Sequence, residues 1–155
     1  MESVSEMWNK FVAAFPEYLN EPYEYWYFGD SPQMALELSS LVLSGRKTAT
    51  CGALWEYEKE NEALPKEGNF SVVTDFHGQA LCVIQTKKVV IQKFMEVDAD
   101  FARKEGEGDL SYEYWNQAHT DFFIRLDSKT NPQFSDDMLL VCEEFEVVFP
   151  IKFAP

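Results

Sequence analysis

Basic residues are scarce in this chain of 155 residues: 13 lysines and arginines stand against 27 aspartates and glutamates, for a formal net charge of −14. Domains that bind long nucleic acids carry a broad basic surface, because contacts with phosphates supply most of their affinity. The charge therefore disfavours a general RNA or DNA coat protein. It leaves room for a pocket that binds a small molecule, a single nucleoside or a short single-stranded RNA.

Long apolar runs and a cysteine framework are also missing. No stretch approaches the roughly 18 apolar residues of a membrane span, and the first residues lack the features of a signal peptide. The odd number and wide spacing of Cys51, Cys82 and Cys142 argue against disulfides and against a zinc site. We therefore expect a cytoplasmic protein with reduced thiols and no membrane partner.

Helical periodicity marks the N-terminal part of the chain. One helix is predicted from the capping box at Ser3 to the stop at Pro16, and another from the cap at Ser31 to Gly45. Later segments rich in β-branched and aromatic residues predict strands over 69–76, 79–94 and 138–149.

A helical insert separates the last two strands. It comprises a short turn over 98–104 and an amphipathic helix over 111–126. No repeat or linker divides the chain, so we expect one domain over 1–155. Its predicted fold class is α+β: a small, mostly antiparallel, curled sheet with helices packed outside it.

The turn from Ser44 to Thr50 is basic and rich in hydroxyls, and it suits a ligand that carries carbonyl or other oxygen atoms. Lys47 and Thr50 are three residues apart and would point to opposite faces of a regular strand. They can share a pocket only if the chain is irregular at Lys47 and the strand begins near Thr48. Alternatively, the turn is solvated, and Arg46 and Lys47 neutralise the C-terminus of the helix.

An acidic, glycine-rich stretch forms the second candidate. Glu105, Glu107 and Asp109 crowd together there, and mutual repulsion can leave one carboxyl protonated and able to act as a general acid or base. The pattern of a calcium loop is absent, and we expect no metal. The alternative is a loop that precedes a helix capped by Asp109 or Ser111.

Aromatic side chains provide a third candidate. The cluster from Tyr23 to Phe28 can stack a planar base, although such residues more often pack a core. His119 lies one turn after Trp115 on the apolar face of its helix. It is either a polar anchor in a pocket or a partly buried side chain whose hydrogen bonds are satisfied.

In this order and spacing, the chain resembles the ASCH superfamily, whose domains share the PUA-like β-barrel fold. The resemblance is carried by Tyr25–Ser31, Leu43–Thr50, Glu105–Asp109, Ser111–Trp115, His119, Phe122 and Phe123. It implies a small, mostly antiparallel β-barrel with helices packed outside.

The resemblance also implies RNA-related roles. A bacterial branch hydrolyses N(4)-acetylcytidine and relies on a Lys, a Thr three residues later and a downstream Glu. Lys47 and Thr50 match the first two, and Glu105 and Glu107 both fit the third. Thr50 would attack the acetyl carbonyl, helped by Lys47 if burial lowers its pKa, and one glutamate would handle protons. Alternatively, Lys47 is only an electrostatic anchor and a glutamate activates water.

No metal or organic cofactor is implied. Two other readings of the same resemblance stay open: a nucleobase-binding module without turnover, and a nuclease for single-stranded RNA. A third is a regulatory domain whose acidic surface meets a basic protein. The expected ligand-binding residues are Tyr25, Trp26, Asp30, Arg46, Trp115 and His119.

Overall fold

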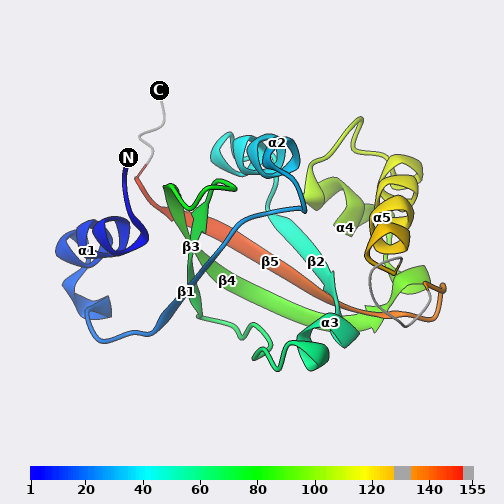
Figure 1. The fold of residues 1–155 in the computed structure, drawn as a ribbon, viewed down its shortest axis with the longest axis horizontal. Helices are drawn as coiled ribbons and strands as arrows, with labels where there is room; N and C mark the ends of the chain where they lie inside the picture. Colours follow the sequence, from blue (N-terminus) through cyan, green and yellow to red (C-terminus); the bar gives the residue numbers. More distant parts are fainter. Residues whose placement is uncertain (128–133, 152–155) are drawn as a thin grey trace.

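A five-stranded mixed sheet runs through the centre of the protein (Figure 1). The computed structural model describes residues 1–127 and 134–151. Only the first pair of strands in the sheet is parallel, and the other three pairs are antiparallel. In spatial order the strands are β1 (Tyr23–Trp26), β3 (Phe70–Thr74), β4 (Ala80–Lys93), β5 (Leu139–Phe149) and β2 (Ala49–Ala53).

The sheet does not close into a barrel. Among the described residues, β1 and β2 are its two edges and are not paired with each other. The register of β4 against β5 shifts at two places, and such irregularities increase bending and twist. The edge strands are short, with 4 and 5 residues. The α+β class is confirmed, and the expected closed barrel is wrong.

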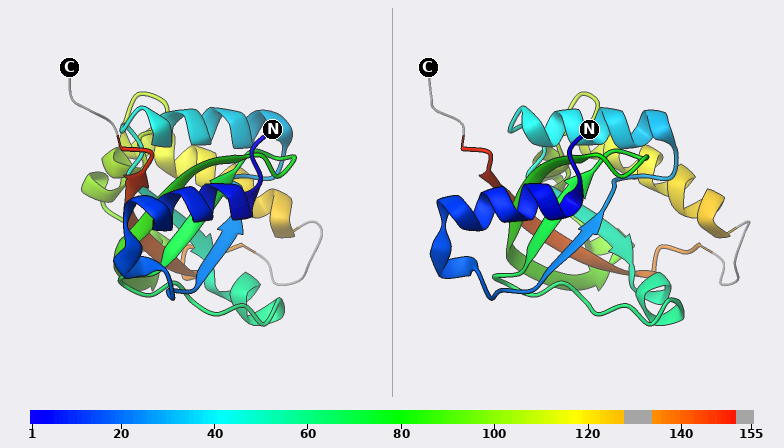
Figure 2. Two further views of the ribbon diagram at one scale, coloured as in Figure 1. Left: turned by 90° about the vertical axis from the view of Figure 1, so that its left-hand side faces the viewer. Right: turned by 60° about the vertical axis from the view of Figure 1, so that its left-hand side comes forward.

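In the described part of the chain, five α-helices cover the sheet (Figure 2), together with two short 3₁₀ helices at 16–18 and 94–96. The segment expected to be a short turn over 98–104 is a helix, and the sequence reasoning missed the helix that follows β2. None of the described helices is long and apolar enough to cross a membrane. The α-helices are α1 (Val4–Ala14), α2 (Pro32–Leu43), α3 (Leu54–Lys59), α4 (Ala99–Glu105) and α5 (Tyr112–Asp127).

Local capping explains where the first two helices begin. The Ser3 hydroxyl accepts from the Glu6 N–H, and the Glu6 carboxylate accepts from the Ser3 N–H, as the capping box predicts. The Ser31 hydroxyl accepts from the Met34 N–H at the start of α2. These bonds satisfy N–H groups that have no partner within a helix.

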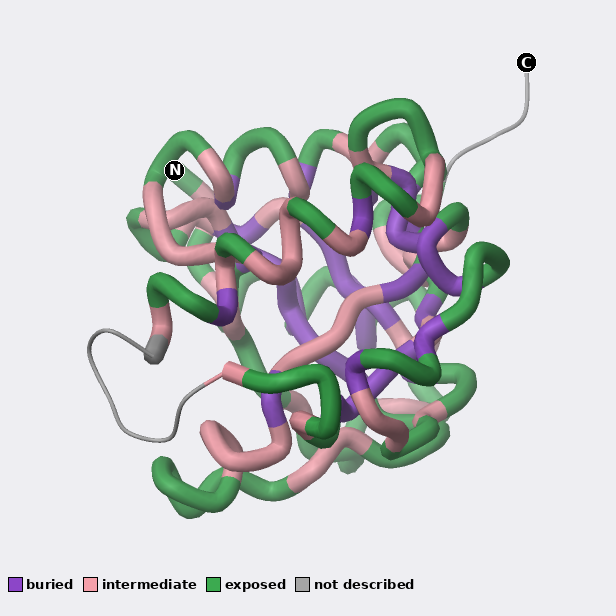
Figure 3. The backbone as a smooth tube through the Cα atoms, turned by 90° about the vertical axis from the view of Figure 1, so that its right-hand side faces the viewer, coloured by how far each residue is buried: buried purple, intermediate pink, exposed green. Residues whose placement is uncertain are grey.

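Three apolar clusters attach the helices to the sheet. The stretches of backbone whose residues are buried run through the interior of the molecule (Figure 3). The helix α1 packs on β3 and β4, while α2 packs with Phe28 on the middle strands. The third cluster joins Trp115 and Phe123 of α5 to Leu140 and Cys142 of β5 and to one face of β2. Each fully buried side chain of this size contributes about 1.5–3 kcal/mol by leaving water.

Candidate functional site

The turn between α2 and β2 directs Lys47 into the protein. Gly45 has φ +83°, a conformation that glycine adopts without strain, and the N–H groups of Arg46 and Lys47 both donate to the carbonyl of Leu41. The strand begins only at Ala49. The chain is therefore irregular at Lys47, which is the condition for Lys47 and Thr50 to share a pocket.

Gly106 brings the acidic stretch against this turn. It ends α4 with φ +73°, and a Cβ atom there would collide with the backbone of Arg46. The Thr48 N–H donates to the carbonyl of Lys104 at 2.8 Å. This close approach places Glu105, the last residue of α4, beside Lys47.

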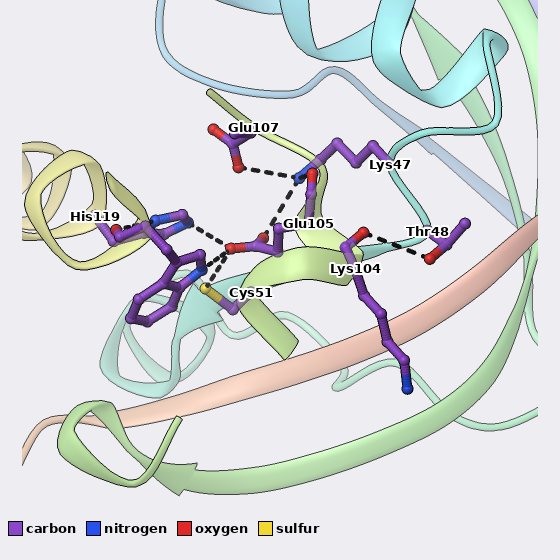
Figure 4. Close-up of polar contacts among 8 residues, drawn as sticks. Lys47, Thr48, Cys51, Lys104, Glu105, Glu107 and His119 are labelled. Carbon is purple, nitrogen blue, oxygen red and sulfur yellow. Dashed lines mark hydrogen bonds and ion pairs between the residues drawn. The ribbon is translucent and has the colours of Figure 1, made fainter. Parts of the chain in front are cut away.

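The ammonium group of Lys47 is enclosed by acceptors (Figure 4). Its Nζ lies 3.4 Å from Glu105 Oε1, 3.3 Å from the Glu105 carbonyl and 3.3 Å from Glu107 Oε2. The same nitrogen lies 5.6 Å from the centre of the Phe28 ring. With 2% of its surface exposed, Lys47 is one of the most deeply buried large residues in the described chain.

The second oxygen of Glu105 is equally occupied. His119 Nε2 lies 2.7 Å from Oε2, the indole N–H of Trp115 donates to the same oxygen, and the Cys51 thiol approaches it at 4.0 Å. His119 Nδ1 lies 2.9 Å from the Trp115 carbonyl. Both ring nitrogens of His119 thus face acceptors, an arrangement that favours the doubly protonated imidazolium.

Opposite charges lie side by side in the buried cluster of Lys47, Glu105, Glu107 and His119. Burial alone would lower the pKa of Lys47, but the carboxylates of Glu105 and Glu107 outweigh it and raise that pKa. Burial would raise the pKa of Glu105, but His119 and Lys47 outweigh it and lower that pKa. Burial opposes the charge on His119 too, and Glu105 raises its pKa nonetheless. The condition under which Lys47 would help Thr50, a pKa lowered by burial, is therefore not met, and Glu105 is not the carboxyl of the acidic stretch that keeps its proton.

One face of the cluster has the composition of a metal site. Ligand atoms of Cys51, Glu105 and His119 lie within 4.8 Å of one another. Metal binding requires a thiolate and a neutral imidazole. Burial holds the pKa of Cys51 well above its usual value, and the Lys47 ammonium already neutralises Glu105. The chemistry of these donors fits an ion-pair network better than a cation site.

A cleft of about 650 Å³ opens between the edge strands β1 and β2. Its size is that of a small-molecule site. Six aromatic and five glutamate residues line it, and no Lys or Arg does so among the described residues. The aromatic residues are Tyr23, Tyr25, Trp26, Tyr27, Phe28 and Tyr57, and the glutamates are Glu24, Glu56, Glu60, Glu62 and Glu143.

Thr50 lines this cleft rather than the Lys47 cluster. It is paired with Glu143 across β2 and β5, so the two side chains share one face of the sheet. The next residue, Cys51, points to the other face and reaches Glu105. Lys47 does meet Glu105 and Glu107 as expected, but Thr50 does not converge with them.

Glu143 is a residue that the sequence reasoning missed. Only 6% of it is exposed, and its Oε1 accepts a hydrogen bond of 2.8 Å from the Thr86 hydroxyl. Burial raises the pKa of this carboxyl, against the effect of Thr86. The sequence did contain a sign of this residue, a carboxylate at an inward-facing position of a mainly apolar strand. The neighbouring Glu144 made that sign harder to recognise.

The cluster and the cleft are neighbours. Phe28 lies against the Lys47 ammonium and also lines the cleft. Cys51 contacts Glu105 and also lines the cleft. The buried cluster therefore packs against the floor of the cleft, and neither Glu105 nor Glu107 lines the cleft.

The expected ligand-binding residues fall into two groups. Tyr25 and Trp26 line the cleft. The other four do not: Trp115 and His119 belong to the buried cluster, Arg46 donates to the Gly108 carbonyl, and Asp30 pairs with Arg125 at 3.3 Å.

Comparison with known proteins gives a consistent family assignment. The model of the ASCH domain family matches residues 24–149. The crystal structure of an ASCH domain from Lactobacillus crispatus JV V101 is 31% identical, with a TM-score of 0.86 over 93% of this chain and 92% of that chain. The protein EF3133 from Enterococcus faecalis V583 is 40% identical, with a TM-score of 0.83 over 94% of this chain and 87% of that chain. No curated protein matches the chain.

Proposed function

The chain belongs to the ASCH domain family, whose members are generally RNA-related, and we propose that it binds an unphosphorylated nucleoside in the cleft between β1 and β2. The observation that carries this proposal is the lining of the cleft, which is aromatic and acidic and includes no Lys or Arg among the described residues. Aromatic faces stack bases of any sequence, whereas carboxylates repel phosphates.

The aromatic residues differ in how they serve such a site. Tyr25 is 67% exposed and Tyr27 is 43% exposed, although both are large apolar rings on one edge of the cleft. Trp26 is packed edge-on against Phe28 at 4.7 Å between ring centres. A planar base that enters the cleft would stack on the rings that face it, Trp26 and Tyr57, and each stacked base contributes about 1–3 kcal/mol.

Quenching of tryptophan fluorescence tests this proposal, because Trp26 lines the cleft. Cytidine should quench the emission saturably, and Tyr57→Ala should weaken binding by about fivefold or more, because Tyr57 lines the cleft near Glu143 and Glu24. Tyr114→Ala is the control, because Tyr114 does not line the cleft. Equal affinity in Tyr57→Ala, Tyr114→Ala and the parent protein would place the nucleoside elsewhere.

Hydrolysis of an N(4)-acetylated nucleoside is the second candidate, and the pairing of Thr50 with Glu143 favours it. The Thr50 hydroxyl would attack the acetyl carbon while its proton passes to the Glu143 carboxylate. The C–N bond then breaks, the amine takes that proton, and water releases acetate from the threonine ester. The raised pKa of Lys47 leaves it protonated, so it supports the floor of the cleft instead of acting as the base.

Chromatography of N(4)-acetylcytidine incubated with the protein tests this second function. Cytidine should form with the parent protein and not with Thr50→Val. Thr48→Val is the matched control, because the Thr48 hydroxyl donates to the Lys104 carbonyl and does not line the cleft. If the parent protein binds the compound and forms no cytidine, the domain is a binding module.

A further inference from the structure

Glu143 differs from the other glutamates of the cleft. It is the only one of the five that is buried; Glu24, Glu60 and Glu62 are exposed and Glu56 is half-buried. It lies on the interior strand β5, whereas the others lie on the edge strand β1 or in the segment that contains α3. Glu143 is therefore the carboxylate held most rigidly in the cleft.

One oxygen of Glu143 is free to meet a ligand. Oε1 accepts from the Thr86 hydroxyl, and no hydrogen bond to Oε2 is formed among the described residues. Oε2 is not one of the buried atoms that lack a partner, so solvent reaches it, and a donor of a ligand in the cleft can replace that water. An ionised carboxylate has no proton to donate, so it accepts from an N–H group and repels a carbonyl oxygen.

We infer that Glu143 sets the base preference of the cleft by accepting a hydrogen bond from an exocyclic amino group of the nucleoside. This inference rests on the proposed nucleoside binding. It predicts that amino-bearing bases, such as cytosine, are preferred over bases with a carbonyl at the same position, such as uracil. A carboxylate that accepts from the cytosine amino group is an established mode of base reading.

The neighbours of Glu143 strengthen the same preference. Glu24 lies close enough to influence the Glu143 carboxyl electrostatically, and Tyr57 lies near both. The negative potential that Glu24 and Glu143 create on this side of the cleft favours a partly positive amino group of the base over a carbonyl oxygen. Thr50, paired with Glu143 across the strands, would then lie beside the amino nitrogen and beside any acyl group attached to it.

Calorimetric titration with cytidine and uridine tests the inference, because these nucleosides differ at the amino position. Cytidine should bind about tenfold more tightly or better, the range expected for one discriminating contact. Glu143→Gln should bring the ratio close to one while uridine binding persists, which shows that the cleft is intact. Glu146→Gln is the matched control on the same strand, because its exposed carboxylate lies outside the cleft and pairs with Lys87.

Adenosine and inosine give a second measurement that requires no variant, because adenosine carries an amino group at the position of its purine where inosine carries a carbonyl. Adenosine should be preferred in the parent protein. Equal affinities for cytidine and uridine, and for adenosine and inosine, would overturn the role of Glu143 but would not contradict the nucleoside site. If none of the four nucleosides binds, the proposed function itself fails.

Discussion

The Nζ atom of Lys47 lies 3.4 Å from Oε1 of Glu105, and both side chains are only 1% exposed. Two opposite charges at this depth are stable only when further polar groups replace the water that they lose. Glu107 supplies a second carboxylate to Lys47, while His119 and Trp115 supply donors to Glu105. The pair therefore fixes α4 against the start of β2, from which Thr50 reaches the cleft.

Removal of the Lys47 charge should destabilise the fold strongly. Lys47→Met leaves Glu105 buried beside Glu107 without a cation between them, and breaking a buried ion pair in this way costs about 3–5 kcal/mol. Urea unfolding measures this loss. The double variant Lys47→Met with Glu105→Gln should lose less than the sum of the two single variants, because the residues share one interaction.

Lys87→Met is the surface control for this experiment. Lys87 and Glu146 form an ion pair of 3.1 Å in which the side chains are 47% and 58% exposed. Its loss should change the free energy of unfolding by less than about 1 kcal/mol. Equal effects of the two lysine variants would contradict the structural role of the buried cluster.

His119 should make the stability of the fold depend on pH. Its pKa in the folded protein is raised above 6.5, with burial opposed and outweighed by Glu105. The stabilisation is thus complete below pH 6.5, the value for the unfolded chain, and is lost as the pH rises through the folded-state pKa. In urea unfolding at a series of pH values, His119→Gln should lack this decline. If the free energy of unfolding changed with pH in the same way in both proteins, His119 would be neutral in the folded protein.

Gly106 should tolerate alanine less well than Gly78 does. Both residues have positive φ, at +73° and +88°, so alanine is strained at either position. A Cβ at Gly106 would also collide with the Arg46 backbone, whereas Gly78 faces open space. Thermal unfolding should show a loss of more than about 1 kcal/mol for Gly106→Ala and a smaller loss for Gly78→Ala. The reverse order would mean that the turn and α4 are further apart than described.

Nucleoside binding should be nearly independent of salt. The cleft offers no Lys or Arg among the described residues, and a nucleoside has no phosphate whose counterions could be released. The affinity for cytidine, measured between about 0.05 and 0.5 M NaCl, should change less than twofold. A steep loss of affinity with salt would instead indicate phosphate-type contacts on a basic surface.

The sequence predicted those features that depend on near neighbours. The helix starts at Ser3 and Ser31 follow from capping, and the late start of β2 follows from the turn at Gly45. The meeting of Lys47 with Glu105 and Glu107 was expected from the family resemblance, and the contacts agree with it.

Features that depend on long-range pairing were not predictable. Glu143 belongs to the cleft because β5 pairs with β2 in the register that sets it opposite Thr50. The open sheet, in which β1 and β2 are edges that do not pair with each other among the described residues, is a property of the assembled fold. The pKa of Lys47 is raised because Glu105 and Glu107 outweigh burial, and the pKa of Glu105 is lowered because His119, Lys47 and Trp115 do so, and only the fold brings these groups together.

The central claim is that the acidic, aromatic cleft accepts a nucleoside without its phosphate. Isothermal titration calorimetry of cytidine and of cytidine 5′-monophosphate, in the same buffer at neutral pH, tests it most directly. The account predicts measurable binding of cytidine and binding at least about tenfold weaker for the monophosphate, because five glutamates line the cleft. Tighter binding of the monophosphate, or no binding of cytidine, would contradict it.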